Sequence, residues 1–195
     1  EGHYVDDEQD GLWSYFSKDG SVAEEITFSG GKRDGRSTVW LTPEEKQEEK
    51  FYKNGKLDGP STFWENGYRS TMTTYRSDSP EGPWVIWFSN SDQIKEQGFH
   101  QKGIREGLTT YYYEDGTMQR EGFFNEGLPD GLWTYWNKKG EKDFDFDFGS
   151  GLQHISLEDL VERESTFYKL GEDIPFTGII TQENPEADYL FLGRT

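Results

Sequence analysis

The sequence predicts an all-β protein, built as an elongated single-layer antiparallel sheet of about six β-hairpin repeats of roughly 24 residues each. Three observations support this prediction. An acidic residue followed by glycine recurs at a nearly constant interval, an aromatic-rich segment follows each of these pairs, and residues 10–150 show almost no helical periodicity. A period of this length is typical of solenoids, propellers and other repeat arrays.

The acidic-glycine pairs define the repeat. Their glycines follow one another at intervals of 24, 24, 23, 25 and 24 residues. The stretch DGLWSYFSKDG, which begins at Asp10, returns as DGLWTYWNKKG at Asp130. We expect the six glycines to be the structural anchors of the repeat: Gly11, Gly35, Gly59, Gly82, Gly107 and Gly131.

Each anchor is followed by two predicted strands. The first is rich in Trp, Tyr, Val and Thr, as strands are. A polar turn comes next, often with the dipeptides that favour tight hairpins, as at Asp19-Gly20, Asn66-Gly67 and Asp115-Gly116. After the second strand, a further glycine-containing turn, such as KNGKLDG at residues 53–59, is expected to contain the next anchor.

Alternation along the first strands predicts an apolar column on each face of the sheet. The fifth position after the acidic-glycine pair holds the residues that we expect to contact a partner: Phe16, Trp40, Trp64, Trp87, Tyr112 and Trp136. The fourth position holds the column of the other face: Tyr15, Val39, Phe63, Ile86, Tyr111 and Tyr135. A single-layer sheet cannot cover both faces by itself, and exposed apolar patches mark binding surfaces. The alternative is that these rings only pack on one another along the sheet.

The repeat pattern divides the chain into three parts. Residues 1–9 are expected to be an N-terminal extension, residues 10–151 the six repeats, and residues 152–195 a degenerate repeat or cap. A capping-box-like Ser156-x-x-Asp159 predicts a short helical turn over residues 156–164. Further strands are expected in IPFTGIITQ and YLFLG, and FYKLG at residues 167–171 echoes FYKNG at residues 51–55.

Composition excludes several kinds of chemistry. The net charge of −18 opposes binding to nucleic acids and to anionic membranes and suits a basic partner. Without cysteine there are no disulfides and no thiolate chemistry. No apolar run approaches the length of a membrane helix. DFDFDF at residues 143–148 could place three aspartates near a cation, but a solvated aspartate face over buried phenylalanines is the simpler interpretation. The histidines share no ligand spacing, and no catalytic motif is present, so we expect no enzyme, no metal and no cofactor.

The repeat resembles the MORN repeat, and more closely the variant units of the bacterial YwqK-type antitoxin family. The resemblance rests on DGLWSYFSKDG, on EGLTTYYYEDGTMQREGFFNEGLPDGLWTYWNKKG and on IPFTGII, and covers residues 10–148 and 167–181. In that family the PFTG element usually precedes the repeats, whereas here it follows six of them. The resemblance implies an antitoxin-like or immunity-like role.

The leading hypothesis is therefore a non-catalytic module that binds a basic protein, as a monomer or as an edge-to-edge dimer. The alternative is an envelope-associated module that binds carbohydrate or cell-wall polymer through its repeated aromatics. Lipid binding is a third hypothesis, opposed by the negative charge. The sequence does not identify the compartment, although the periplasm or cell envelope is slightly favoured over the cytoplasm.

Overall fold

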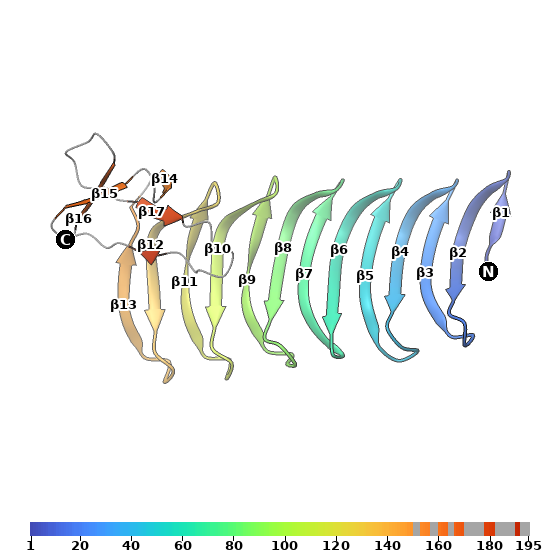
Figure 1. Ribbon diagram of the computed structural model, residues 1–195, viewed down its shortest axis with the longest axis horizontal. Helices are drawn as coiled ribbons and strands as arrows, with labels where there is room; N and C mark the ends of the chain where they lie inside the picture. Colours follow the sequence, from blue (N-terminus) through green and yellow to red (C-terminus); the bar gives the residue numbers. More distant parts are fainter. Residues whose placement is uncertain (150–152, 157–159, 164–165, 170–177, 182–189, 192–195) are drawn as a thin grey trace.

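The computed structural model describes residues 1–149, 153–156, 160–163, 166–169, 178–181 and 190–191. Within this part of the chain there is no helix, and a single antiparallel sheet dominates, with each strand beside its neighbours in sequence (Figure 1). Its thirteen strands are β1 (His3–Val5), β2 (Glu8–Phe16), β3 (Val22–Ser29), β4 (Lys32–Trp40), β5 (Lys46–Lys53), β6 (Lys56–Glu65), β7 (Tyr68–Arg76), β8 (Ser79–Trp87), β9 (Ile94–Gln101), β10 (Ile104–Tyr112), β11 (Met118–Asn125), β12 (Leu128–Trp136) and β13 (Lys142–Asp147). The predicted all-β array of hairpins is confirmed.

The sheet begins before the first predicted repeat. β1 lies within the residues expected to form an extension, and it pairs with β2 through His3–Asp10, Tyr4–Gln9 and Val5–Glu8. The Trp13 indole donates a hydrogen bond from Nε1 to the His3 carbonyl at 3.2 Å. The N-terminal residues are therefore an additional strand of the array.

The C-terminal part contains two small sheets. β14 (Gln153–Ser156) is parallel to β17 (Gly178–Thr181), which pairs with β18 (Leu190–Phe191), and β15 (Leu160–Arg163) is antiparallel to β16 (Thr166–Lys169). The helical turn predicted over residues 156–164 is therefore wrong, although residues 157–159 and 164 lie outside the described part. A helix this short pays a nucleation cost for very few hydrogen bonds, whereas β15 pairs all four of its residues with β16.

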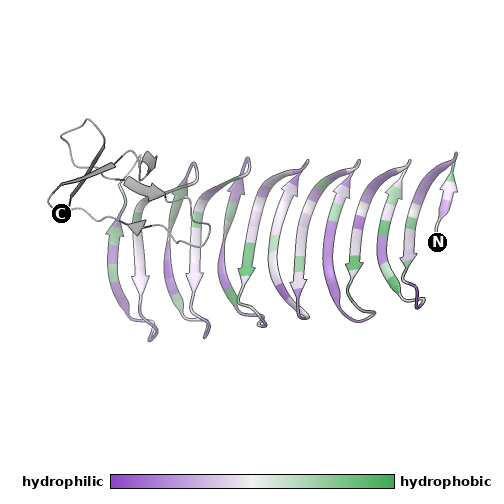
Figure 2. Cartoon of the chain, in the orientation of Figure 1, coloured by the Kyte–Doolittle hydropathy of each residue, from purple (hydrophilic) through white to green (hydrophobic). Residues whose placement is uncertain are grey.

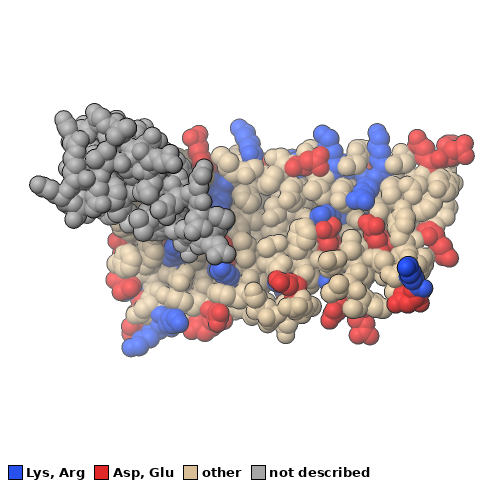
Figure 3. Space-filling model, in the orientation of Figure 1, with Lys and Arg blue, Asp and Glu red and all other residues tan. Residues whose placement is uncertain are grey.

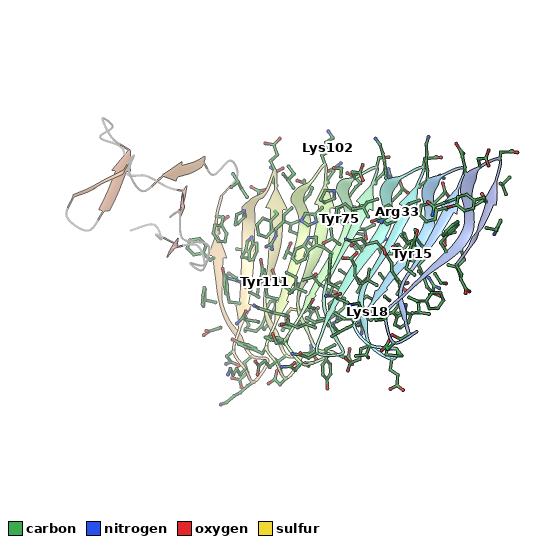
Figure 4. All side chains as sticks on the ribbon, turned by 45° about the vertical axis from the view of Figure 1, so that its right-hand side comes forward. Tyr15, Lys18, Arg33, Tyr75, Lys102 and Tyr111 are labelled. Atoms are coloured by element: carbon green, nitrogen blue, oxygen red, sulfur yellow. The ribbon has the colours of Figure 1, made fainter. Side chains whose placement is uncertain are left out.

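One edge of the sheet is made of tight two-residue turns. Both residues of each turn have positive φ, between 49° and 85°, as type I′ turns require. These turns are Asp6-Asp7, Gly30-Gly31, Asn54-Gly55, Ser77-Asp78, Lys102-Gly103 and Glu126-Gly127. Figure 4 labels Lys102 at this tight-turn edge and Lys18 at the opposite edge. The predicted turns Asp19-Gly20, Asn66-Gly67 and Asp115-Gly116 all lie at that opposite edge.

The anchor glycines lie inside strands, which corrects the expectation that they belong to turns. Ile26 pairs with Ser37 while Phe28 pairs with Arg33, so that residues 34–36 stand opposite Thr27 alone. Gly35, at φ 117°, lies in this bulge, and a Cβ on it would stand 3.0 Å from the Thr27 Cβ. Bulges bend a strand and increase its twist. The bowed strands of Figure 1 agree with a bulge in each repeat.

The acidic residue of five of the six anchors binds the tight turn of the next hairpin. Asp34 Oδ2 accepts a hydrogen bond from the Asn54 backbone N–H at 2.9 Å, and the Arg33 carbonyl accepts one from Gly55 at 2.7 Å. The same carboxylate-to-turn bond recurs at Asp10, Asp58, Glu81 and Glu106. The repeated acidic residue thus links consecutive hairpin units through a hydrogen bond. Only the sixth anchor differs, since Asp130 Oδ1 is buried without a hydrogen-bond partner among the described residues.

Candidate partner-binding surfaces

The register of the strands assigns side chains to two faces, because directly opposite residues point to the same side of a sheet. We call face A the side that carries Trp13, Trp84 and Trp133, and face B the side that carries the predicted partner-binding column. Figure 2 shows that hydrophobic bands along the strands are short and interrupted by hydrophilic ones. In the view of Figure 3, most charged atoms lie toward the two turn edges of the sheet.

Face A contains the core of the array. The Trp133 ring packs edge-on against Phe124 and Phe148, with centroids 5.3 and 5.7 Å apart, and Trp133 is only 3% exposed. The indole lies across Gly122, where a Cβ would stand 2.2 Å from the Trp133 Cδ2 atom, and its Nε1 donates to the Phe123 carbonyl at 3.1 Å. These tryptophans therefore stabilise the sheet itself.

The structure brings the predicted partner-binding residues together in one column on face B. Each stands opposite a residue of the following strand, and the pairs are Phe16–Val22, Trp40–Lys46, Trp64–Arg69, Trp87–Ile94, Tyr112–Met118 and Trp136–Lys142. Aromatic and cationic side chains thus alternate along part of the column.

Several of these rings are already in contact with cations of the chain itself. The Lys46 ammonium lies 5.8 Å from the Trp40 ring and 5.5 Å from the Trp64 ring, and the Arg69 guanidinium lies 4.7 Å from the Trp87 ring. Trp87 is buried, at 8% exposure, while Phe16 is open, at 48%. Cation–π contacts of this kind stabilise the fold. The role of the column in binding a partner stays a prediction.

A second apolar feature of face B was missed from the sequence. Phe99, Leu108, Phe123 and Leu132 are 43–58% exposed, and Pro83 is exposed beside them. Pro83 pairs with Phe99 and Leu108 pairs with Phe123, while Leu132 holds the position of Leu108 in the next repeat. We call these five residues the apolar stripe. It crosses β8 to β12 and leaves large side chains in solvent.

The signal for the apolar stripe lay at the first position after the anchor. That position holds Leu12, Arg36, Pro60, Pro83, Leu108 and Leu132. A phenylalanine stands opposite it at Arg36, Pro83 and Leu108, and only at Pro83 and Leu108 are both partners apolar. Because the first position varies between repeats, it gave no column in the sequence. Only the pairing of the strands shows that Phe99 and Phe123 lie beside this position.

Carboxylates flank the apolar stripe on both sides. Toward the tight-turn edge, Glu106 stands opposite Phe99 and Asp130 stands opposite Phe123. Toward the other edge, Glu121 pairs with Thr110 and Thr134, which share face B. The apolar stripe thus has two carboxylates on one side and one on the other. Such a surface suits a segment that carries both apolar and basic side chains.

The aspartates and phenylalanines of DFDFDF point to opposite faces as predicted, but the expected burial of the phenylalanines holds only in part, since Phe148 is 5% exposed and Phe144 is 50% exposed. Phe144 stacks on Tyr135 with centroids 4.5 Å apart, and Phe146 packs against Phe148 on the same face. Asp145 accepts a hydrogen bond from the Lys142 ammonium at 2.6 Å, which lowers the pKa of its carboxyl. In the part of the chain that the structure describes, no group of three or more His, Cys, Asp and Glu side chains could hold a metal ion. That part also contains no helical segment suited to a transmembrane span.

Comparison with known families identifies the hairpin unit. The model of the MORN repeat variant family matches residues 9–29 and 105–126. The first match covers the hairpin of β2 and β3, and the second covers the hairpin of β10 and β11. The comparison with curated proteins gave no match. The MORN repeat is a non-catalytic module. Two hairpins of the array are therefore similar to the MORN repeat variant.

Proposed function

We propose that this protein is a non-catalytic module that binds a basic protein partner through the apolar stripe. MORN repeats in general are modules that bind proteins or membranes. The observation that carries the proposal is the apolar stripe, with its four large side chains 43–58% exposed between Glu106 and Asp130 on one side and Glu121 on the other. Contiguous exposed apolar surface of this kind usually marks an interaction site.

Charge supports a basic partner. The chain carries a net charge of −18, and an acidic surface accelerates encounter with a basic protein while opposing nucleic acids and anionic membranes. The proposed division of labour follows from general interface energetics. Aromatic side chains that the partner covers on binding, such as Phe99 and Phe123, contribute most of the affinity. The surrounding carboxylates contribute to the association rate and to selectivity.

A pull-down from the lysate and envelope fractions of the source cell, at low and then raised salt, tests this proposal. A basic protein that elutes with salt supports it. Phe123→Ser combined with Leu108→Ser should then weaken the complex at least roughly tenfold, because interface aromatics are often hot spots. Leu12→Ser is the matched control, since Leu12 holds the same repeat position with 52% exposure but lies far from the stripe. Equal loss with the control, or recovery of no protein, would contradict the proposal.

The antitoxin-like or immunity-like role is the finer form of this proposal. It is supported by the resemblance of the repeat to YwqK-type proteins and by the acidity that would let the array cover a basic toxin. Co-expression with the captured partner tests it. Growth inhibition by the partner alone, relieved by the wild-type chain and not by the stripe variant, is the expected result. A partner that is harmless when expressed alone would exclude this role while leaving the binding function intact.

The alternative proposal is carbohydrate or cell-wall binding in the cell envelope. It is favoured by the partly open rings of Phe16, Trp40 and Trp64, which lie on every second strand about 10 Å apart, and by the partly open ring of Trp136 on β12. Retention on insoluble wall polysaccharide, lost in Trp136→Ala and kept in the stripe variant, would favour it over the leading proposal. We propose that the array acts as a monomer or as an edge-to-edge dimer, which sedimentation velocity distinguishes.

A further inference from the structure

Face A is hollowed at the later repeats. A groove of about 980 Å³ lies there, lined among the described residues by side chains of β9 to β12 and of the turns at the edge opposite the tight turns. Its cations are Lys95, Arg105, Arg120 and Lys138, and its acids are Glu96, Glu114 and Asp115. In a chain of charge −18, the described residues that line this groove therefore include four cations and three acids. At physiological ionic strength, charges more than about 8–10 Å away are largely screened, so these local cations determine what the groove attracts.

One of the two arginines of the groove is fully engaged by the protein. Arg105 donates from Nη1 to the Tyr111 hydroxyl at 3.2 Å, and its Nη2 lies 3.5 Å from Glu96 Oε2. Its guanidinium lies over the Trp84 ring at 4.5 Å. Arg105 is therefore part of the structural framework of the groove.

Arg120 is placed differently. Its guanidinium lies 4.1 Å from the centroid of the Tyr111 ring, and Tyr111 and Tyr135 stand opposite it on the two neighbouring strands. The Arg120 side chain hydrogen-bonds to Tyr135, but its Nε is buried without a hydrogen-bond partner, and among the described residues no carboxylate forms an ion pair with Arg120. Burial also raises the pKa of Tyr111 and of Tyr135, as expected in a poorly hydrated site. A buried charged donor without an acceptor is unfavourable unless a ligand supplies one.

We propose that this groove binds an acidic peptide segment, with a glutamate or aspartate carboxylate of that segment paired to Arg120. Stacking on Tyr111 holds the guanidinium plane in place, which suits the two-point recognition of a carboxylate. Lys95 and Lys138 lie at other points of the groove lining and face further carboxylates of the same segment. Tyr113, whose ring lies 5.7 Å from the Lys138 ammonium, offers surface for neighbouring apolar side chains.

The shape of the groove favours a peptide over a small metabolite. Its lining runs across four strands and adjoining turns, and its volume is at the upper end of small-ligand pockets. Cations distributed along this length match an extended chain that carries several acids. The site is on the opposite face from the apolar stripe and selects the opposite charge, so this inference does not rest on the function proposed above.

Fluorescence anisotropy with the full chain tests the inference. The probe is a fluorescein-labelled peptide of alternating glutamate and phenylalanine, compared with the same peptide carrying glutamine or lysine in place of glutamate. We expect the glutamate peptide to bind at least roughly tenfold more tightly than either, and binding to weaken as salt rises from about 0.05 to about 0.5 M. Equal affinity for the glutamate and glutamine peptides would overturn the inference.

Variants locate the binding. Arg120→Gln should weaken the glutamate peptide at least roughly tenfold, whereas Arg76→Gln, at the exposed end of β7, should leave it unchanged. Thermal unfolding confirms that each variant is folded. If Arg120→Gln does not fold, Arg120→Lys retains the charge, removes the planar fork and should still weaken binding. Unchanged affinity in a folded Arg120 variant would refute the assignment. Displacement of the peptide by free glutamate or inorganic phosphate at equal concentration would overturn the peptide assignment and identify the groove as a small-anion site.

Discussion

Gly122→Ala tests whether the buried tryptophans of face A depend on the glycines beneath them. A Cβ at this position would stand 2.2–2.3 Å from three atoms of the Trp133 indole, far inside van der Waals contact. Trp133 is 3% exposed and is held by Phe124 and Phe148, so the ring cannot move aside without opening the core. Overpacking of a core costs about 1–3 kcal/mol, and loss of the indole hydrogen bond adds about 1 kcal/mol.

Strand propensity acts in the opposite direction, because alanine is favoured over glycine in a strand by about 0.5–1 kcal/mol. We therefore expect a net decrease of about 2–3 kcal/mol in the free energy of unfolding, measured by urea denaturation with circular dichroism and tryptophan fluorescence. Trp133→Leu provides the control. In that background the cost of Gly122→Ala should fall below about 1 kcal/mol, because the clash is gone. A neutral or stabilising Gly122→Ala in the wild-type background would refute the packing argument.

Three further predictions concern two contacts of the repeat and the titration of His100. Asp34→Ala removes the acceptor for the Asn54 N–H and should lower the free energy of unfolding by about 1–2 kcal/mol in urea denaturation, with a smaller loss for Asp34→Asn, which keeps an acceptor oxygen. Gly59→Ala should cost at least about 2 kcal/mol, because φ is 123° and the new Cβ would stand 2.9 Å from the Phe51 Cβ, and a cost below about 0.5 kcal/mol in the same assay would contradict the bulge argument. Burial and a neighbouring arginine lower the pKa of His100 below 6.5 in the folded protein. As the pH falls, the unfolded chain therefore takes up the proton before the folded protein does. The free energy of unfolding should decrease as the pH drops from 6.5 through the pKa of the folded state. NMR titration of the ring should show the lowered pKa, and His100→Gln should reduce the loss of stability in that pH range.

The candidate surfaces show where inference from residues was sufficient and where it failed. The column from Phe16 to Trp136 was correctly predicted to lie on one face, because the side of a strand to which a residue points depends only on its position along that strand. Its contacts with Lys46 and Arg69 depend on the cross-strand register, which the sequence did not contain. The apolar stripe was missed for the same reason. Phe99 and Leu108 become neighbours only when the strands are paired.

The acidic-glycine anchors were correctly recognised as structural but were placed in the wrong element. Asp-Gly is a favoured turn dipeptide, and a positive φ inside a strand looks the same in sequence as one in a turn. The structure separates the two, since Asn54-Gly55 forms the tight turn and Asp58-Gly59 lies within β6. The prediction of a helical turn at residues 156–164 was wrong because a local capping signal is weaker than pairing with a second strand.

The sequence by itself determined the period, the hairpin unit, the all-β class and the two-faced strands, because each depends on residue type and spacing within a few positions. Tertiary structure decided which contacts the period produces. It showed that Asp34 reaches a turn twenty residues further on, that Trp133 covers Gly122, and that the partly buried Arg120 stacks on Tyr111 without an ion-paired carboxylate among the described residues. The physical reason is that such contacts depend on the register and curvature of paired strands, which follow from the hydrogen-bonded sheet as a whole.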